Sequence, residues 1–217
     1  MNAKEIYDLL RAGGLSRAGA LGMLGNMQAE SGLKENIAQR GMTTMSDEQY
    51  TAAADNGRIN FSGDAVGYGL CQWTSSDRKA ALLNKARSYA CSVGDGTMQV
   101  EFCLDELIQD YPTLYAFLCT ADSIDECSDR ICKEFERPAT NNFLTRRDFS
   151  HAFENQVFDT GEKEKKEVFS KAFPKDATVL ALQLWLNYNG YPVEANGYKS
   201  PEFFKVLRQF VDDMEVC

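Results

Sequence analysis

Glu30 is the residue whose type and position most clearly suggest chemistry. Met27, Asn26 and Met23 precede it by three, four and seven residues, so a helix would place all four on one face. Apolar neighbours and the negative end of a helix dipole both disfavour the charged form of a carboxyl. A carboxyl that keeps its proton near neutral pH can act as a general acid. Glu30 is therefore a candidate for a general acid, and the alternative is an ordinary solvated glutamate at a helix end.

Two further acidic residues could take part in that chemistry. Glu136 ends a predicted helix beside Arg137, and this pattern fits either a structural ion pair or a catalytic carboxylate. In the catalytic case Glu136 would stay ionised while Glu30 is protonated, as in enzymes that use two carboxyls in different roles. Asp64 lies on a polar, glycine-interrupted stretch and is a rival candidate for the base.

Residues 67–74 combine glycines with aromatic side chains in a way that suits a sugar ligand. Tyr68 and Trp73 offer flat faces for sugar rings and polar tips for hydroxyl groups. Gln72 can donate and accept hydrogen bonds at once, as an N-acetyl group requires. Gly67 and Gly69 let the backbone approach a ligand closely. The alternative is that Trp73 belongs to the core and that Tyr68 is a half-buried packing residue.

These residues must be positioned by helices, because apolar residues recur along most of the chain at helical spacing. Serines, glycines and prolines mark the helix ends. The predicted helices cover residues 3–12, 16–30, 46–54, 75–91, 97–111, 114–119, 123–136, 145–158, 178–187 and 201–214. We therefore expect an all-α fold. The long polar stretch at residues 33–67 is expected to be either functional or disordered.

The helix that leads to Glu30 carries a stripe of glycines. Gly19, Gly22 and Gly25 recur at every third position. Each glycine costs about 1 kcal/mol relative to alanine inside a helix. Three of them in one helix therefore predict that another backbone packs closely against it.

A change in composition divides the chain into two parts. Residues 162–167 are a charged run and Pro174 follows, so we predict a linker at residues 159–176. The linker would join a catalytic domain of residues 1–158 to a small three-helix module of residues 177–217. The alternative is that the charged run is the solvated end of the preceding helix.

The overall composition excludes several classes of protein. The chain has 217 residues and a net charge of −9, which opposes binding to nucleic acids and to anionic membrane surfaces. No apolar run is long enough for a membrane-spanning helix, and the first residues do not resemble a signal peptide. The seven cysteines include no CxxC pair, so we expect reduced, structural thiols in a protein made in a cytosol.

The single histidine, His151, limits the chemistry further. Catalytic zinc sites usually draw on two or three histidines, or on cysteine and histidine at close spacing. We therefore expect no metal and no other cofactor. A thiol peptidase built from Cys71 and His151 is a formal alternative. It is disfavoured because no acidic residue that would orient His151 is evident from the sequence.

Three blocks of sequence, taken in order, resemble the phage-tail-type lysozymes, which are distant relatives of goose-type lysozymes and lytic transglycosylases. The blocks are residues 22–33, residues 67–74 and residues 135–138, followed by Arg146 or Arg147 near the start of a helix. The third block begins with Phe135 where the family usually has tyrosine. Together the blocks cover residues 14 to about 158.

This resemblance implies a lysozyme-like helical fold and a role for each block. Glu30 would be the proton donor, residues 67–74 would line a sugar cleft, and Glu136 would be a second acidic candidate. Asn26 and Ser31, which belong to the first block, join the substrate-binding candidates.

Residues 179–210 resemble a peptidoglycan-binding module of the three-helix type. The resemblance rests on Leu182, Gln183 and Leu186, on residues 190–193, and on Asn196-Gly197 where the module usually has Asp-Gly. The alternative is a C-terminal helical hairpin that packs on the catalytic domain.

We therefore expect a muramidase, which cleaves the β-1,4 bond between N-acetylmuramic acid and N-acetylglucosamine, used as a phage endolysin. It would act on bacterial peptidoglycan as a monomer, accumulate in the host cytoplasm and reach the cell wall after the membrane is opened. A lytic transglycosylase is the nearest alternative, because it would keep Glu30 and need no second carboxylate. A virion-associated or non-catalytic wall-binding protein is a third possibility.

Overall fold

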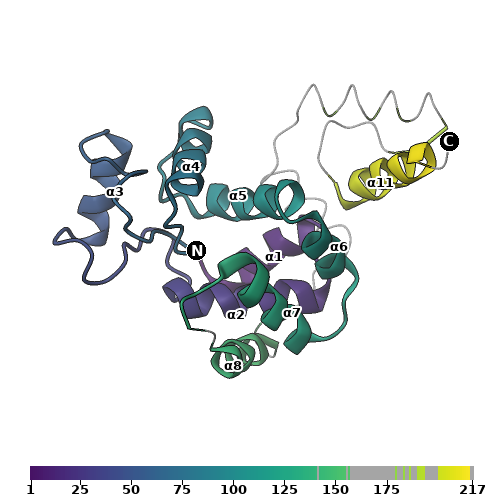
Figure 1. The fold of residues 1–217 in the computed structure, drawn as a ribbon, viewed down its shortest axis with the longest axis horizontal. Coiled ribbons are helices and arrows are strands. Elements are labelled where there is room, and N and C mark those ends of the chain that lie inside the picture. The colour runs from purple at the N-terminus through teal and green to yellow at the C-terminus, as the bar shows by residue number, and fades with distance from the viewer. Residues whose placement is uncertain are drawn as a thin grey trace.

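The computed structural model describes residues 1–140, 142–154, 156, 179, 183, 186, 190–193 and 200–215. In this part of the chain the regular elements are helices, and two isolated β-bridges are the only sheet-like pairings. The elements are α1 (Ala3–Ala12), α2 (Arg17–Ser31), α3 (Asp47–Asp55), α4 (Ser76–Ser88), α5 (Gly96–Gln109), α6 (Pro112–Thr120), α7 (Ile124–Arg130), the π-helix η1 (Ile131–Glu136), α8 (Phe143–Glu154) and α11 (Pro201–Glu215) (Figure 1). The all-α expectation is confirmed.

Most of these helices begin at a side chain that caps them, which is why the sequence predicted their starts. The capping side chains that accept a hydrogen bond from the first turn are those of Asn2, Ser16, Ser46, Asp95 and Ser123. One predicted helix, residues 123–136, differs from the expectation. It changes from α to π winding at Ile131, and the π-helical stretch ends at Glu136.

Helix α2 lies at the centre of the described part of the chain, with α1, α6, α7 and α8 packed around it (Figure 1). The prediction of close backbone packing along its glycine stripe is confirmed. A Cβ atom at each glycine would come too close to a backbone atom of a neighbouring helix: 2.3 Å from Leu118 O at Gly19, 2.9 Å from Ser128 N at Gly22, and 2.6 Å from Arg146 O at Gly25. The stripe thus brings α6, α7 and α8 against the helix that carries Glu30.

The long polar stretch between α2 and α4 is anchored to α4 by Lys79. This side chain is fully buried, and its Nζ donates hydrogen bonds to Tyr50 Oη at 3.0 Å, to Asp64 Oδ1 at 2.5 Å and to Val66 O at 2.7 Å. Burial lowers the pKa of Lys79, while the hydrogen bond and the charge of Asp64 oppose this effect. Asp64, the rival candidate for a base, is therefore one half of a structural ion pair.

The described residues beyond 156 form a second hydrophobic cluster around α11. Its buried members are Val179, Leu186 and Phe203. On the same helix, Phe204 meets Tyr115 of α6 edge to face, with ring centroids 6.4 Å apart. The predicted linker at residues 159–176 lies outside the described residues. The three-helix module and its boundary therefore stay predictions. Every helix in the described part of the chain is too short or too polar to cross a membrane.

Candidate active site

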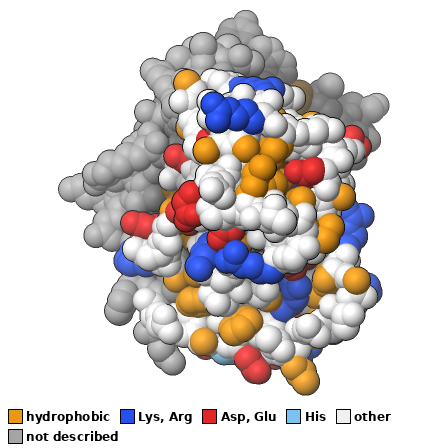
Figure 2. Space-filling view, turned by 90° about the vertical axis from the view of Figure 1, so that its left-hand side faces the viewer, with side chains coloured by type: hydrophobic (Ala, Val, Ile, Leu, Met, Phe, Trp, Pro, Cys, Tyr) orange, Lys and Arg blue, Asp and Glu red, His pale blue; other side chains and the backbone are white. Residues whose placement is uncertain are grey.

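One cleft of about 930 Å³ contains both predicted catalytic carboxyls. It is lined by Glu30, Ile37, Ala38, Gln39, Arg40, Cys71, Gln72, Thr74, Ser75, Arg78, Glu136, Arg137, Pro138 and Ala139. Figure 2 shows that acidic and basic side chains meet across the middle of one face of the molecule. The cleft is therefore assembled from the end of α2, the polar stretch, the start of α4 and the end of η1.

Glu30 is held by a buried arginine. Its Oε1 accepts a hydrogen bond from Arg146 Nη2 of α8 at 2.5 Å, and Arg146 Nη1 donates to Asn26 Oδ1 at 2.9 Å. Asn26 is fully buried, and its amide donates to the carbonyl groups of Gly22 and Ser128. The structure therefore corrects the assignment of Asn26 to substrate binding, because its side chain positions Arg146 and cannot reach the cleft.

Glu136 is placed by an unusual stretch of backbone. It is the last residue of η1, where the N–H of Arg137 donates to Cys132 O at 2.8 Å, five residues back. Arg137 then has a left-handed conformation with φ of 48°. Turns of π-helix and left-handed non-glycine residues both cluster at functional sites. Glu136 therefore lines the cleft at the point where the π-helix ends in a left-handed residue.

The carboxyl of Glu136 is in a poor environment for a charge. Its Oε1 is completely buried and has no hydrogen-bond partner among the described residues. Burial and the nearby charge of Glu30 raise the pKa of Glu136 to about 8, although Arg78 and Arg146 oppose the shift. The direction of this shift disfavours the ionised form and so opposes the prediction that Glu136 stays ionised. The sequence could not reveal this, because the depth of burial is set by the tertiary fold.

Arg78 lines the same cleft and was missed by the sequence analysis. Its Nε and Nη2 donate to the two carboxylate oxygens of Glu106 at 2.5 and 2.8 Å, and its guanidinium lies 4.7 Å from the ring centroid of Phe135. Trp73 Nε1 donates to the same carboxylate at 2.8 Å. The one feature of the sequence that could have indicated Arg78 is its position in the first turn of the helix that follows residues 67–74.

The expectation that Tyr68 and Trp73 stack on sugar rings is wrong in this structure, since both side chains are fully buried. Trp73 packs against Phe102, while Tyr68 packs against Tyr50 and Phe61. The glycines and aromatic residues of this segment instead build a tight turn, in which Tyr68 and Trp73 exchange two backbone hydrogen bonds. The alternative of a core residue fits Trp73, whereas Tyr68 is buried more deeply than the half-buried alternative predicted.

The glycines of this segment and Ser31 are also structural. A Cβ atom at Gly69 would lie 2.5 Å from Gln99 Oε1, and one at Gly67 would lie 3.0 Å from Gln72 Oε1, so side chains of the protein occupy the space beside both glycines. Ser31 Oγ donates to Leu70 O at 3.0 Å and so joins α2 to the segment. This corrects three further substrate-binding assignments.

Gln72 is the substrate-binding candidate that does line the cleft. Its backbone has a left-handed φ of 45°, and its Nε2 donates to Gly69 O at 3.0 Å. Because Nε2 is engaged in this hydrogen bond, the side-chain oxygen Oε1 of Gln72 is the atom that could accept a hydrogen bond from an amide N–H of a ligand.

A family model described as phage tail lysozyme matches residues 1–157. The chain belongs to the phage tail lysozyme family. The match includes Glu30, Glu136 and the whole cleft, and it makes the chain a peptidoglycan-lytic enzyme. No significant match is found among curated proteins.

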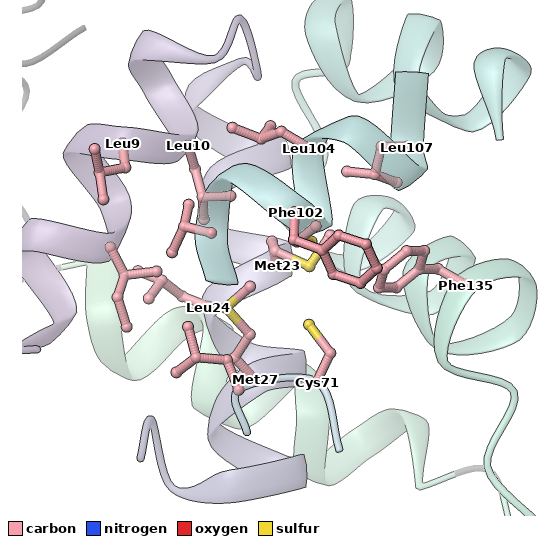
Figure 3. Packing of buried hydrophobic residues seen from close by; sticks show 14 of the residues in the cluster. Leu9, Leu10, Met23, Leu24, Met27, Cys71, Phe102, Leu104, Leu107 and Phe135 are labelled. Atoms are coloured by element: carbon pink, nitrogen blue, oxygen red, sulfur yellow. The ribbon is translucent and has the colours of Figure 1, made fainter. Parts of the chain in front are cut away.

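The phage tail lysozyme cleft does not hold a cysteine–histidine pair. Cys71 is almost fully buried beside Cys103, and burial raises the pKa of its thiol, so the nucleophilic thiolate is disfavoured. Figure 3 shows its sulfur pointing into the core among Met23, Met27 and Phe102.

His151 lies on the exposed side of α8, and both of its ring nitrogens face carboxylates. The partners are Asp125 at 2.8 Å and Glu154 at 3.3 Å, so acidic neighbours that the sequence did not reveal are present. These hydrogen bonds raise the pKa of His151. A thiol peptidase is therefore incompatible with the positions of the two side chains. In the described part of the chain, no cluster of histidine, cysteine and acidic residues could hold a metal ion.

Proposed function

We propose that the chain is a muramidase that cleaves the β-1,4 bond between N-acetylmuramic acid and N-acetylglucosamine. The observation that carries this proposal is the presence of Glu30 and Glu136 in one cleft, since most glycosidases use a pair of carboxyls. The charge of Glu30 is one cause of the raised pKa of Glu136, so the two groups interact electrostatically.

In this proposal Glu136 donates the proton. Its raised pKa keeps the carboxyl neutral at pH 7, so it can protonate the glycosidic oxygen as the bond to the leaving sugar breaks. Glu30, fixed by Arg146, supplies the carboxylate that stabilises the positive charge developing on the muramyl ring. Water then adds to the anomeric carbon, and the proton it releases restores the protonated carboxyl. These roles are the reverse of those predicted from the sequence.

Mass spectrometry of the fragments released from purified peptidoglycan tests this reaction. We expect fragments that end in a reducing N-acetylmuramic acid. Fragments lighter by one water, with an internal anhydro ring, would identify a lytic transglycosylase. Peptides with new amino termini would contradict glycosidase chemistry altogether, and walls that stay intact would favour a non-catalytic wall-binding protein.

We also propose that the enzyme acts as a phage endolysin that accumulates in the host cytoplasm. The six described cysteines are free, which suits a protein made in a reducing cytosol. The family description favours the alternative, a lysozyme carried in the phage tail. Immunodetection separates the two. The chain should be abundant in the lysate and absent from purified virions, whereas a fixed number of copies per virion would contradict the endolysin role.

A further inference from the structure

The cleft is lined by three arginines that differ in their partners. Arg78 pairs with Glu106 at 2.5 Å, and Arg40 pairs with Asp47 at 3.2 Å. Arg137 has no acidic partner among the residues that the structure describes, and its hydrogen bond goes to the phenol oxygen of Tyr111. The positive charge of Arg137 is therefore available to an anion that is not one of the described residues.

The exposed side chain of Arg137 makes two contacts with Tyr111. Its Nη2 donates to Tyr111 Oη at 2.9 Å, and its guanidinium lies 5.8 Å from the centroid of the same ring. Tyr111 in turn packs edge to face on Phe135, with centroids 5.4 Å apart. A guanidinium has five N–H donors, so this one hydrogen bond leaves a fork free for a planar anion.

The proposed substrate offers such an anion beside the bond that is cleaved. A chain of N-acetylglucosamine is neutral. The muramyl sugar, in contrast, carries a lactyl group that ends either in its own carboxylate or in a peptide with carboxylates. Arg137 directly follows Glu136, the proposed proton donor, so an anion bound to Arg137 would lie close to the reacting sugar.

We infer that Arg137 binds a carboxylate on the lactyl substituent of the muramyl residue, and so selects peptidoglycan over uncharged N-acetylglucosamine glycans. This inference rests on the proposed muramidase function. It assigns the fork of Arg137 to recognition, and Tyr111 and Phe135 to holding that fork in place. Arginine–carboxylate pairs of this kind are bidentate and charge-assisted, so they add both affinity and orientation.

Three soluble substrates test the inference with Arg137→Gln. The first is glycan strands with their peptides, the second is strands stripped by an amidase so that lactyl carboxylates are exposed, and the third is N-acetylglucosamine oligosaccharides without carboxylates. We expect kcat/KM for the carboxylate-bearing strands, relative to the oligosaccharides, to fall about tenfold, which corresponds to about 1.4 kcal/mol. Arg137→Lys keeps the charge without the fork and should recover part of this preference.

The pattern of loss identifies the carboxylate. A loss on the amidase-stripped strands alone supports the free lactyl carboxylate, and a loss on the peptide-bearing strands alone supports a peptide carboxylate. A loss on both kinds of strand supports recognition of either carboxylate by Arg137. An equal loss on all three substrates, or no loss on any, overturns the inference. Arg58→Gln is the matched control, because Arg58 is exposed and lies outside the cleft lining. Thermal unfolding of each variant verifies that it is folded.

Measurements of glycan binding test this inference separately from the proposed muramidase function. Dissociation constants for the same three glycans, measured by calorimetry in a Glu30→Gln background, report on Arg137 without any bond cleavage. If the wild-type enzyme cleaves none of the glycans, the muramidase proposal fails. The change in relative affinity on Arg137→Gln still decides whether Arg137 recognises a carboxylate.

Discussion

At the scale of single residues, the stability of the enzyme should depend on the proton held by Glu136. Its pKa is raised from an ordinary 4.5 to about 8 by burial and by the charge of Glu30. Between these values the folded chain binds a proton that the unfolded chain has released, so the free energy of unfolding falls as pH rises from about 4.5 to about 8. In the Glu136→Gln variant, the free energy of unfolding should fall less over this pH range. Melting temperatures at pH 5 and pH 8 measure it.

Glu134→Gln is the control for that experiment, because Glu134 lies on the same π-helix but pairs with Arg130. It should keep the wild-type dependence on pH. If Glu136→Gln also keeps the full dependence, Glu136 is ionised in the folded enzyme and the assignment of the proton to it is wrong.

The electrostatic link between Glu30 and Glu136 gives a second prediction. The activity of the wild-type enzyme should be lost as pH rises through about 8, because the donor then loses its proton. In Glu30→Gln one cause of the raised pKa of Glu136 is removed, so that pKa should fall. Infrared or carbon-13 NMR titration of labelled glutamate measures the shift. An unchanged pKa would show that the two carboxyls do not interact.

The same residues show how far the sequence could predict the site. Glu30 and Glu136 could be chosen from their blocks, but the raised pKa of Glu136 could not be predicted. Arg146, which fixes Glu30, lies 116 residues away in the sequence. Tyr68 and Trp73 were misassigned because flanking glycines suit a ligand and a tight turn equally well. The side chain that occupies the space beside Gly69 comes from Gln99 of α5, 30 residues further along the chain.

At the scale of elements, the glycine stripe of α2 sets the distance between α2 and α8. A Cβ atom at Gly25 would lie 2.0 Å from Ser150 Oγ as well as 2.6 Å from the Arg146 carbonyl. Gly25→Ala should therefore destabilise the protein by about 1–3 kcal/mol, the usual cost of overpacking. It should also lower activity, because Arg146 would be displaced from Glu30.

Urea unfolding measures this change in stability. Gly96→Ala is the control, because a Cβ atom there would meet the flexible end of Met1 and not a backbone. Equal stability of the Gly25→Ala variant and the wild type would show that α8 can move away at little cost.

The elements were easier to predict than their junctions. Capping side chains and apolar spacing are local, so the starts of most helices could be predicted from the sequence. The π-helical stretch that ends at Glu136 has no such local signal in the sequence. The residue after it, Arg137, has a left-handed backbone conformation that arginine rarely adopts, so its sequence did not predict this junction either. That junction, and not the helices, places the second carboxyl in the cleft.

At the scale of the whole molecule, the two hydrophobic clusters are separate, so residues 1–158 should fold without the tail. This fragment should cleave soluble glycan strands at close to the rate of the full chain. It should bind intact cell walls less well, since a wall-binding module raises the local concentration of enzyme at an insoluble substrate. Pelleting with purified walls measures binding, and circular dichroism verifies folding.

Equal pelleting of the fragment and the full chain would make residues 177–217 a structural hairpin. The ring contact between Phe204 and Tyr115 would then be its main described attachment to the catalytic part. The net charge of −9 gives the enzyme no electrostatic attraction to an anionic wall, so any contribution of the tail to binding should survive moderate salt.

The central claim is that Glu30 and Glu136 together cleave a glycosidic bond. The most direct test is kcat/KM on soluble peptidoglycan strands for the wild type, Glu30→Gln, Glu136→Gln and the control Glu134→Gln. Each of the first two variants should stay folded and lose roughly 10²–10⁴-fold, the usual contribution of a catalytic carboxyl, while the control stays within about twofold of the wild type. If either variant keeps more than about a tenth of the wild-type value, that carboxyl has no catalytic role and the two-carboxyl mechanism is wrong.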